Sequence, residues 1–294
     1  MSDERAPDAR WLWSQIESWY DENARDLPWR SADATPWGVL VSEIMLQQTP
    51  VARVLPIWTQ WLSRWPTPAA LAVEEPAAAI RAWARLGYPR RALRLHAAAR
   101  AIDALHDGEV PADEDVLRSL PGIGEYTAAA VAAFAFHRRS VVLDTNVRRV
   151  LGRILRGEAL PSPGVTKAER AEAAALVPTD GLDASHWAVA VMELGALVCT
   201  ARSPGCAACP VRTRCRWFEA GRPAALDRPR SQGYEGTDRQ ARGRILAVLR
   251  GADDPVPPSA LEPAWLPIEQ RERALASLLA DGLIVLDSGD YRLP

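Results

Sequence analysis

The 294-residue sequence predicts an all-α protein that ends in a small α+β domain. Apolar residues recur at helical spacing in segments bounded by capping residues, and alternation of the strand type is almost absent before residue 280. The segment Leu120–Thr127 also contains a Pro-Gly-x-Gly turn between two stretches of helical composition. Proline fixes φ and the glycines tolerate positive φ, so this segment predicts a tight hairpin between two helices.

The remaining elements follow from periodicity and caps. The first predicted helix covers residues 8–24, the second covers 37–48, and Thr49-Pro50 opens the third. Further helices are expected at 68–73, 76–86, 89–106, 113–119, 125–136, from Asp144 onward, 167–177 and 183–198.

The C-terminal part has a different composition. Residues 219–237 are rich in Pro, Gly and Arg, which is typical of a linker. Helices are expected near 238–250, 258–265 and 268–281, followed by a hairpin around Ser288-Gly289-Asp290. The predicted domains are therefore 1–218, containing a cysteine loop at 199–215, a linker at 219–237, and a winged-helix-like domain at 238–294.

The charge is close to neutral but unevenly distributed. The formal net charge is −2, yet six arginines lie between residues 81 and 100 with no acid among them. A second arginine cluster at 138–156 contains one acid, and we expect both clusters to contact phosphate. The N-terminus has no apolar core of a signal peptide and the longest apolar run is short, so we expect a cytoplasmic protein that makes no use of a membrane.

All four cysteines lie within 17 residues, at Cys199, Cys206, Cys209 and Cys215. Such a cluster in a cytosolic protein predicts a metal centre rather than disulfides. The spacing alone does not separate zinc from an iron–sulfur cluster, because both accept four thiolates.

Two carboxylates are candidates for acid–base chemistry. Glu43 shares its helix face with Val39, Leu40 and Leu46, so burial would raise its pKa and make it a general acid. The alternative is a buried glutamate that pairs with an arginine such as Arg30.

Asp144 follows an apolar run and opens a helix, which predicts an N-cap. We expect its bonds to the N–H of Asn146 or Val147, together with the helix dipole, to keep this carboxylate ionised. One carboxyl with a raised pKa and one with a lowered pKa is the arrangement used in glycoside hydrolysis.

Taken together, these motifs resemble the helix-hairpin-helix DNA glycosylases of the endonuclease III superfamily. The segment Val41–Thr49 (Val-Ser-Glu-Ile-Met-Leu-Gln-Gln-Thr) resembles the catalytic helix of the MutY-type adenine glycosylases within it. The resemblance covers roughly residues 26–217 and implies a six-helix barrel, an iron–sulfur helical domain, and action on double-stranded DNA that contains a mispaired adenine. The cysteine spacing resembles the [4Fe–4S] loop of this superfamily, and we expect a monomer.

The resemblance also implies roles for individual residues. Glu43 protonates adenine at N7, Asp144 stabilises the positive sugar, and Asn146 supports Asp144. The resemblance implies that Gln48 and Tyr88 wedge into the DNA helix, and DNA binding implies association with the nucleoid. From the arginine clusters and the hairpin turn, we also expect the DNA backbone to contact Arg90, Arg91, Arg148, Gly122 and Gly124. The implied adenine pocket comprises Trp29, Arg30, Leu46 and Glu193.

Tyr126 bears on the type of reaction. Bifunctional relatives carry a lysine there and cut the strand through a Schiff base, whereas Tyr126 has no amine. The single lysine of the chain, Lys167, lies away from every motif, which predicts base removal without efficient strand cleavage. Thymine mismatch glycosylases share this feature, so removal of thymine or another base remains the alternative activity; a non-catalytic DNA-binding regulator is a second alternative.

The sequence departs from the family pattern in two places. Thr145 follows the catalytic aspartate where most MutY-type enzymes have glycine. We also expect no Nudix-like C-terminal domain, which leaves the preference for 8-oxoguanine over guanine open.

Overall fold

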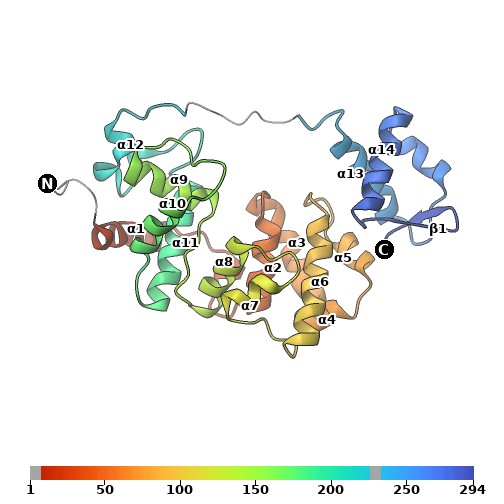
Figure 1. Ribbon diagram of the computed structural model, residues 1–294, viewed down its shortest axis with the longest axis horizontal. Helices are drawn as coiled ribbons and strands as arrows, with labels where there is room; N and C mark the ends of the chain where they lie inside the picture. The colour runs from red at the N-terminus through yellow and green to blue at the C-terminus, as the bar shows by residue number, and fades with distance from the viewer. Residues whose placement is uncertain (1–7, 226–232) are drawn as a thin grey trace. The chain divides into compact units, whose positions relative to one another are not determined.

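A computed structural model describes residues 8–225 and 233–294 (Figure 1). The chain divides into two compact units. The first comprises Met1–Val39, Ala112–Arg118 and Gly124–Pro229, and the second comprises Leu40–Pro111, Ser119–Ile123 and Arg230–Pro294. The predicted domain boundaries at 218 and 238 stay predictions, and residues 226–232 of the predicted linker lie outside the described part.

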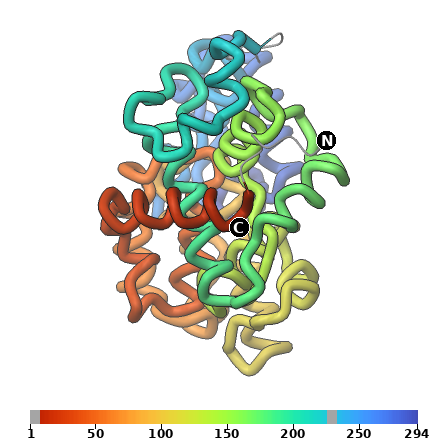
Figure 2. The backbone as a smooth tube through the Cα atoms, turned by 90° about the vertical axis from the view of Figure 1, so that its left-hand side faces the viewer, coloured from red at the N-terminus to blue at the C-terminus, as the bar shows by residue number. Residues whose placement is uncertain are grey.

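The first unit is built around one long central helix. It contains α1 (Ala9–Asn23), η1 (Pro28–Arg30), α8 (Glu125–Phe136), α9 (Thr145–Leu151), η2 (Gly152–Arg156), α10 (Lys167–Leu176), α11 (Gly181–Leu197), η3 (Cys206–Ala208), η4 (Arg212–Arg214) and α12 (Arg216–Glu219). Helix α11 packs against α1, α8 and α9, and Figure 2 shows α1, in red, against it. Leu12, Ile16, Trp187 and Leu194 are buried in the shared core.

The second unit contains the helices that follow α2 (Pro36–Leu46), an element that begins in the first unit. These are α3 (Val51–Arg64), α4 (Pro68–Ala72), α5 (Pro76–Ala82), α6 (Arg90–Leu105), α13 (Asp238–Arg250), the 3₁₀ helix η5 (Pro258–Ala264) and α14 (Ile268–Ala280). Helix α7 (Glu114–Ser119) precedes the Pro-Gly-x-Gly hairpin, and α8 follows it. Trp61, Trp65 and Trp83 pack edge to face in this core.

The two strands are confined to the C-terminal segment. Strands β1 (Val285–Asp287) and β2 (Asp290–Arg292) pair antiparallel, with Val285 opposite Arg292. Ser288 and Gly289 both adopt positive φ, as a two-residue hairpin requires. The predicted all-α body with a small α+β end is thus confirmed, although the segment expected as a helix at 258–265 is 3₁₀ and the helix expected at 76–86 ends at Ala82.

The C-terminal segment packs on α5 within the second unit. Ile80 of α5 is fully buried in the same core cluster as Ile245, Leu278 and Ile284. Arg250 Nε donates to the Ile80 carbonyl at 3.1 Å, and other backbone and side-chain hydrogen bonds join the two parts. No helix in the described residues is long and apolar enough to span a membrane.

Candidate active site and cysteine loop

Asp144 is the N-cap of α9. Its Oδ1 accepts the backbone N–H of Val147 at 2.6 Å, and its Oδ2 accepts the Asn146 side-chain amide at 2.8 Å. Arg149 continues this network, because its Nη2 donates to Asn146 Oδ1 at 2.7 Å and to the Gly195 carbonyl at 2.8 Å. A Cβ at Gly195 would lie 2.7 Å from Asn146 Cβ, so only glycine lets α9 and α11 approach this closely. The predicted cap and the support from Asn146 are both present.

The protonation behaviour of Asp144 differs from the expectation. Burial raises the pKa of Asp144 above its usual range, although the N–H bonds and Arg149 act in the opposite direction. The expectation of a lowered pKa is therefore wrong, because it counted the cap bonds and not the desolvation. A desolvated carboxylate interacts more strongly with a positive charge that appears beside it, which suits a group that stabilises a cationic sugar.

Glu193 lies on α11 with a fully buried side chain. Arg25 holds both of its oxygens, with Nε 2.6 Å from Oε1 and Nη2 2.7 Å from Oε2, and Arg30 Nη2 donates to Oε2 at 2.9 Å. The two guanidinium groups hold the pKa of Glu193 at about 2. Arg30 Nη1 is buried and makes no hydrogen bond within the described residues, and the buried Trp29 precedes it in η1.

Arg25 is a site residue that the sequence did not point to. It contacts Glu193 across 168 residues of chain, and its backbone N–H also donates to Glu193 Oε1 at 3.1 Å. The one feature of the sequence that could have indicated this role is the position of Arg25, three residues before Pro28 at the start of the loop that carries Trp29 and Arg30.

Glu43 lies on α2 and is 6% exposed. Val39 and Leu40, which share its helix face, are buried as well and Leu46 is half-buried, in agreement with the apolar face predicted from the sequence. Its general-acid role stays a prediction.

Gln48 and Tyr88, the two predicted wedge residues, share an unusual backbone conformation. Both have positive φ, 55° at Gln48 and 46° at Tyr88, and Gly87 before Tyr88 has φ 83°. Non-glycine residues in this region cost about 1–3 kcal/mol each and cluster at functional sites. Tyr88 is 49% exposed, as a residue that enters DNA must be.

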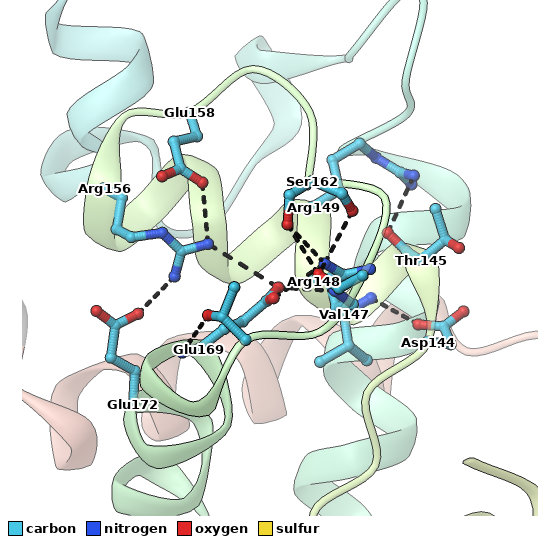
Figure 3. Close-up of polar contacts among 12 residues, drawn as sticks. Asp144, Thr145, Val147, Arg148, Arg149, Arg156, Glu158, Ser162, Glu169 and Glu172 are labelled. Atoms are coloured by element: carbon cyan, nitrogen blue, oxygen red, sulfur yellow. Dashed lines mark hydrogen bonds and ion pairs between the residues drawn. The ribbon is translucent and has the colours of Figure 1, made fainter. Parts of the chain in front are cut away.

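Two arginines expected to contact phosphate are inside the protein. Arg91 is 6% exposed and bonds backbone carbonyls of its own unit. Arg148 is 8% exposed, and its Nε and Nη2 donate to Glu169 at 2.8 and 2.9 Å (Figure 3). Its Nη2 also donates to the Gly164 carbonyl. Because these guanidinium groups are buried and hydrogen-bonded within the protein, the prediction that Arg91 and Arg148 contact phosphate is wrong.

The remaining predicted DNA contacts are exposed. Gly124 is the N-cap residue of α8 and a Cβ there would meet nothing within 4 Å, so a phosphate can approach the helix N-terminus. Gly122 has φ 77° and packs on Arg94, where a Cβ would lie 2.6 Å from the Arg94 Cβ. Arg90 is half-exposed and forms an ion pair with Asp281 at 3.2 Å. The half-buried Tyr126 lies in the first turn of α8.

The four cysteines line one pocket, together with Arg153 and apolar side chains that include Val150 and Leu194. All four thiols are free. Arg153 Nη1 lies 3.2 Å from Cys199 Sγ, and burial beside the other cysteines raises the pKa of Cys209 to about 12. In residues 8–225 and 233–294, no three His, Cys, Asp or Glu side chains are grouped to hold a single metal ion.

Comparison with known proteins places this geometry in a family. Residues 41–175 match the HhH-GPD superfamily of base excision DNA repair proteins. An adenine DNA glycosylase of Mycobacterium tuberculosis is 51% identical over 284 residues, which cover 96% of this chain and 93% of that protein. An adenine DNA glycosylase of Mycolicibacterium smegmatis is 52% identical, covering 92% of this chain and 91% of that protein.

A solved structure agrees at the level of the fold. A thermostable thymine-DNA glycosylase superposes with a TM-score of 0.64 at 26% identity, covering 72% of this chain and 97% of that one. The chain belongs to the adenine DNA glycosylase family of the HhH-GPD superfamily.

Proposed function

We propose that this protein is a monofunctional DNA glycosylase that removes adenine mispaired with 8-oxoguanine or guanine from double-stranded DNA. The observation that carries the proposal is the 51% identity to an adenine DNA glycosylase over 96% of the chain. The capped Asp144 and the buried Glu193 with its two arginines support it. In this proposal the protein acts as a monomer, in the cytoplasm at the nucleoid.

The proposed reaction breaks the bond between N9 of adenine and C1′ of the sugar. Glu43 donates a proton to N7, so that the bond electrons leave with a neutral base. The sugar becomes an oxocarbenium ion, which the Asp144 carboxylate stabilises by charge. Water adds at C1′ and loses a proton to Glu43, which releases adenine and leaves an abasic site.

The target adenine must leave the duplex to be reached, at a cost of a few kcal/mol. Gln48 and Tyr88 would fill the space it vacates, and the exposure of Tyr88 supports this role. Trp29, Leu46, Arg30 and Glu193 would hold the extruded base. The buried Arg30 Nη1, which has no hydrogen-bond partner within the described residues, offers a donor to a ring nitrogen. Glu193, whose two oxygens already accept from Arg25 and Arg30, would hold Arg30 in position for this contact.

The cysteine loop is proposed to hold a [4Fe–4S] cluster through Cys199, Cys206, Cys209 and Cys215. A thiol with a pKa of about 12 does not ionise by itself at neutral pH, and a bound metal supplies the positive charge that it needs. When bound, the cluster would supply iron–thiolate bonds that close the loop. Arg149 Nε donates to the Cys199 carbonyl at 2.7 Å, so the loop also helps to position the network behind Asp144.

A panel of labelled duplexes tests the function. We expect alkali-labile product from adenine opposite 8-oxoguanine and opposite guanine, and none from thymine opposite guanine. Without alkali the strand should stay intact, because Tyr126 provides no amine. Glu43→Gln should abolish excision while DNA binding is kept. Product from thymine opposite guanine alone would establish the rival activity instead.

A further inference from the structure

The buried guanidinium of Arg91 lies at the C-terminal end of α2. Its Nη1 donates to the carbonyls of Ile44 at 2.9 Å, Met45 at 3.1 Å and Gln47 at 2.6 Å. The last carbonyls of a helix have no partner within the helix, and a cation is favourable there. Arg91 therefore caps the helix that carries Glu43, directly before Gln48.

The other nitrogen of the same group reaches a second segment. Nη2 of Arg91 donates to the Gly87 carbonyl at 3.1 Å and to Thr49 Oγ1 at 3.0 Å. Its Cζ also lies 5.5 Å from the centroid of the Tyr88 ring. The planar guanidinium group of Arg91 thus binds the residues on both sides of Gln48 and the residue before Tyr88.

The two segments that Arg91 binds contain residues in an unfavourable backbone conformation. Gln48 and Tyr88 are non-glycine residues with positive φ, a conformation that persists where the surroundings impose it. The acceptors of the five Arg91 hydrogen bonds are neutral, and burial lowers the pKa of Arg91 to about 10. An arginine buried without a carboxylate among these acceptors acts here through the geometry of its hydrogen bonds and not through an ion pair.

We propose that Arg91 is a positioning residue for DNA distortion, which fixes Gln48 and Tyr88 relative to each other through one guanidinium group. This inference rests on the proposed function, because it takes the two residues as the wedge. It assigns to Arg91 a role in opening the base stack and none in phosphate binding or in the chemical step.

The experiment uses the full chain and separates distortion from chemistry. Arg91→Met removes the guanidinium group. Arg91→Lys keeps the positive charge and the aliphatic part of the side chain, and it serves as the second variant if Arg91→Met does not fold. Each is placed in the Glu43→Gln background and mixed with a duplex that carries 2-aminopurine next to a mispaired adenine, whose fluorescence rises on unstacking. Arg250→Met is the matched control, since Arg250 is another arginine in the same unit that donates to a backbone carbonyl.

We expect the fluorescence rise in Glu43→Gln and in the Arg250 control, and its loss in both Arg91 variants, with the dissociation constant and its salt dependence unchanged. With Glu43 restored, the single-turnover excision rate of the Arg91 variants should fall roughly 100-fold. This defect should shrink on adenine opposite an abasic site, where extrusion costs less, and lysine should not rescue it because it cannot bridge the two segments.

A normal fluorescence rise in both Arg91 variants would overturn the inference, as would an equal loss of rate on both substrates. Failure of the proposed function gives a different pattern. In that case the parent protein excises no adenine, while the fluorescence comparison between parent and variants still decides the role of Arg91.

Discussion

The buried carboxylate of Glu193 allows a quantitative prediction about stability. Its pKa falls from the usual 4.5 to about 2 in the fold, because Arg25 and Arg30 hold the charged form. That difference corresponds to about 3 kcal/mol of folding free energy at neutral pH. Glu193→Gln should lose about this amount, in line with the cost of breaking a buried ion pair from one side.

The pH dependence has a definite sign. The unfolded chain binds the proton more tightly than the folded protein, so the stabilisation is complete above pH 4.5 and is lost as the pH falls toward 2. About half of it should be gone near pH 3.2. The cost of Glu193→Gln should shrink over the same interval.

Urea unfolding of the parent and Glu193→Gln at several pH values between 7 and 3 measures this directly. Glu172→Gln is the control, because Glu172 also pairs with an arginine, Arg156, but is 41% exposed. Pairs of that kind contribute only about 0–1 kcal/mol. A cost of Glu193→Gln below about 1 kcal/mol at pH 7, or a cost that does not change with pH, would refute the reasoning.

Three further predictions follow from the site. Asp144→Asn should keep the N-cap and remove a desolvated charge, so chemical denaturation at pH 7 should show an unchanged or higher free energy of unfolding. The single-turnover rate of excision should fall about 1000-fold, and a marked loss of stability would contradict this prediction. Arg148→Met should lower the free energy of unfolding in urea by about 3–5 kcal/mol, because it leaves Glu169 buried and unpaired. The salt dependence of DNA binding should stay the same; a slope of log K against log salt concentration that is smaller by about one would instead indicate that Arg148 contacts a phosphate. In Cys209→Ser, elemental analysis should show a loss of iron and spectroscopy a loss of the visible absorption of the cluster. Zinc found in the parent protein would reject the iron–sulfur assignment.

The helices and the cap of α9 could be predicted because their signals are local. Asp144 after an apolar run indicates a helix start within a few residues, and its side chain accepts the expected backbone N–H of Val147. The hairpin before α8 was visible for the same reason. These features depend on neighbours in the chain and not on the tertiary fold.

The errors concern contacts between distant residues. Arg91 and Arg148 belong to arginine-rich stretches with few acids, which indicated a solvent-facing phosphate surface. The acceptors of Arg91 are mostly backbone carbonyls, which every residue carries and no sequence pattern marks. Arg148 pairs with Glu169, which lies 21 residues away in another helix. The Arg25–Glu193 pair was missed for a similar reason, since 168 residues separate its partners. The pKa of Asp144 was misjudged because desolvation depends on the packing of the whole unit.

The sharing of one core by Ile80 and the C-terminal helices affects how the protein folds during synthesis. Ile80 is synthesised 165 residues ahead of Ile245, which at cellular translation rates is a delay of about 10–30 s. During that interval the apolar side of α5 has no cover and is available to chaperones or to a second nascent chain. A shortened protein that ends before α13 would carry the same bare surface permanently, so its poor solubility would be a consequence of the missing cover and would say nothing about catalysis.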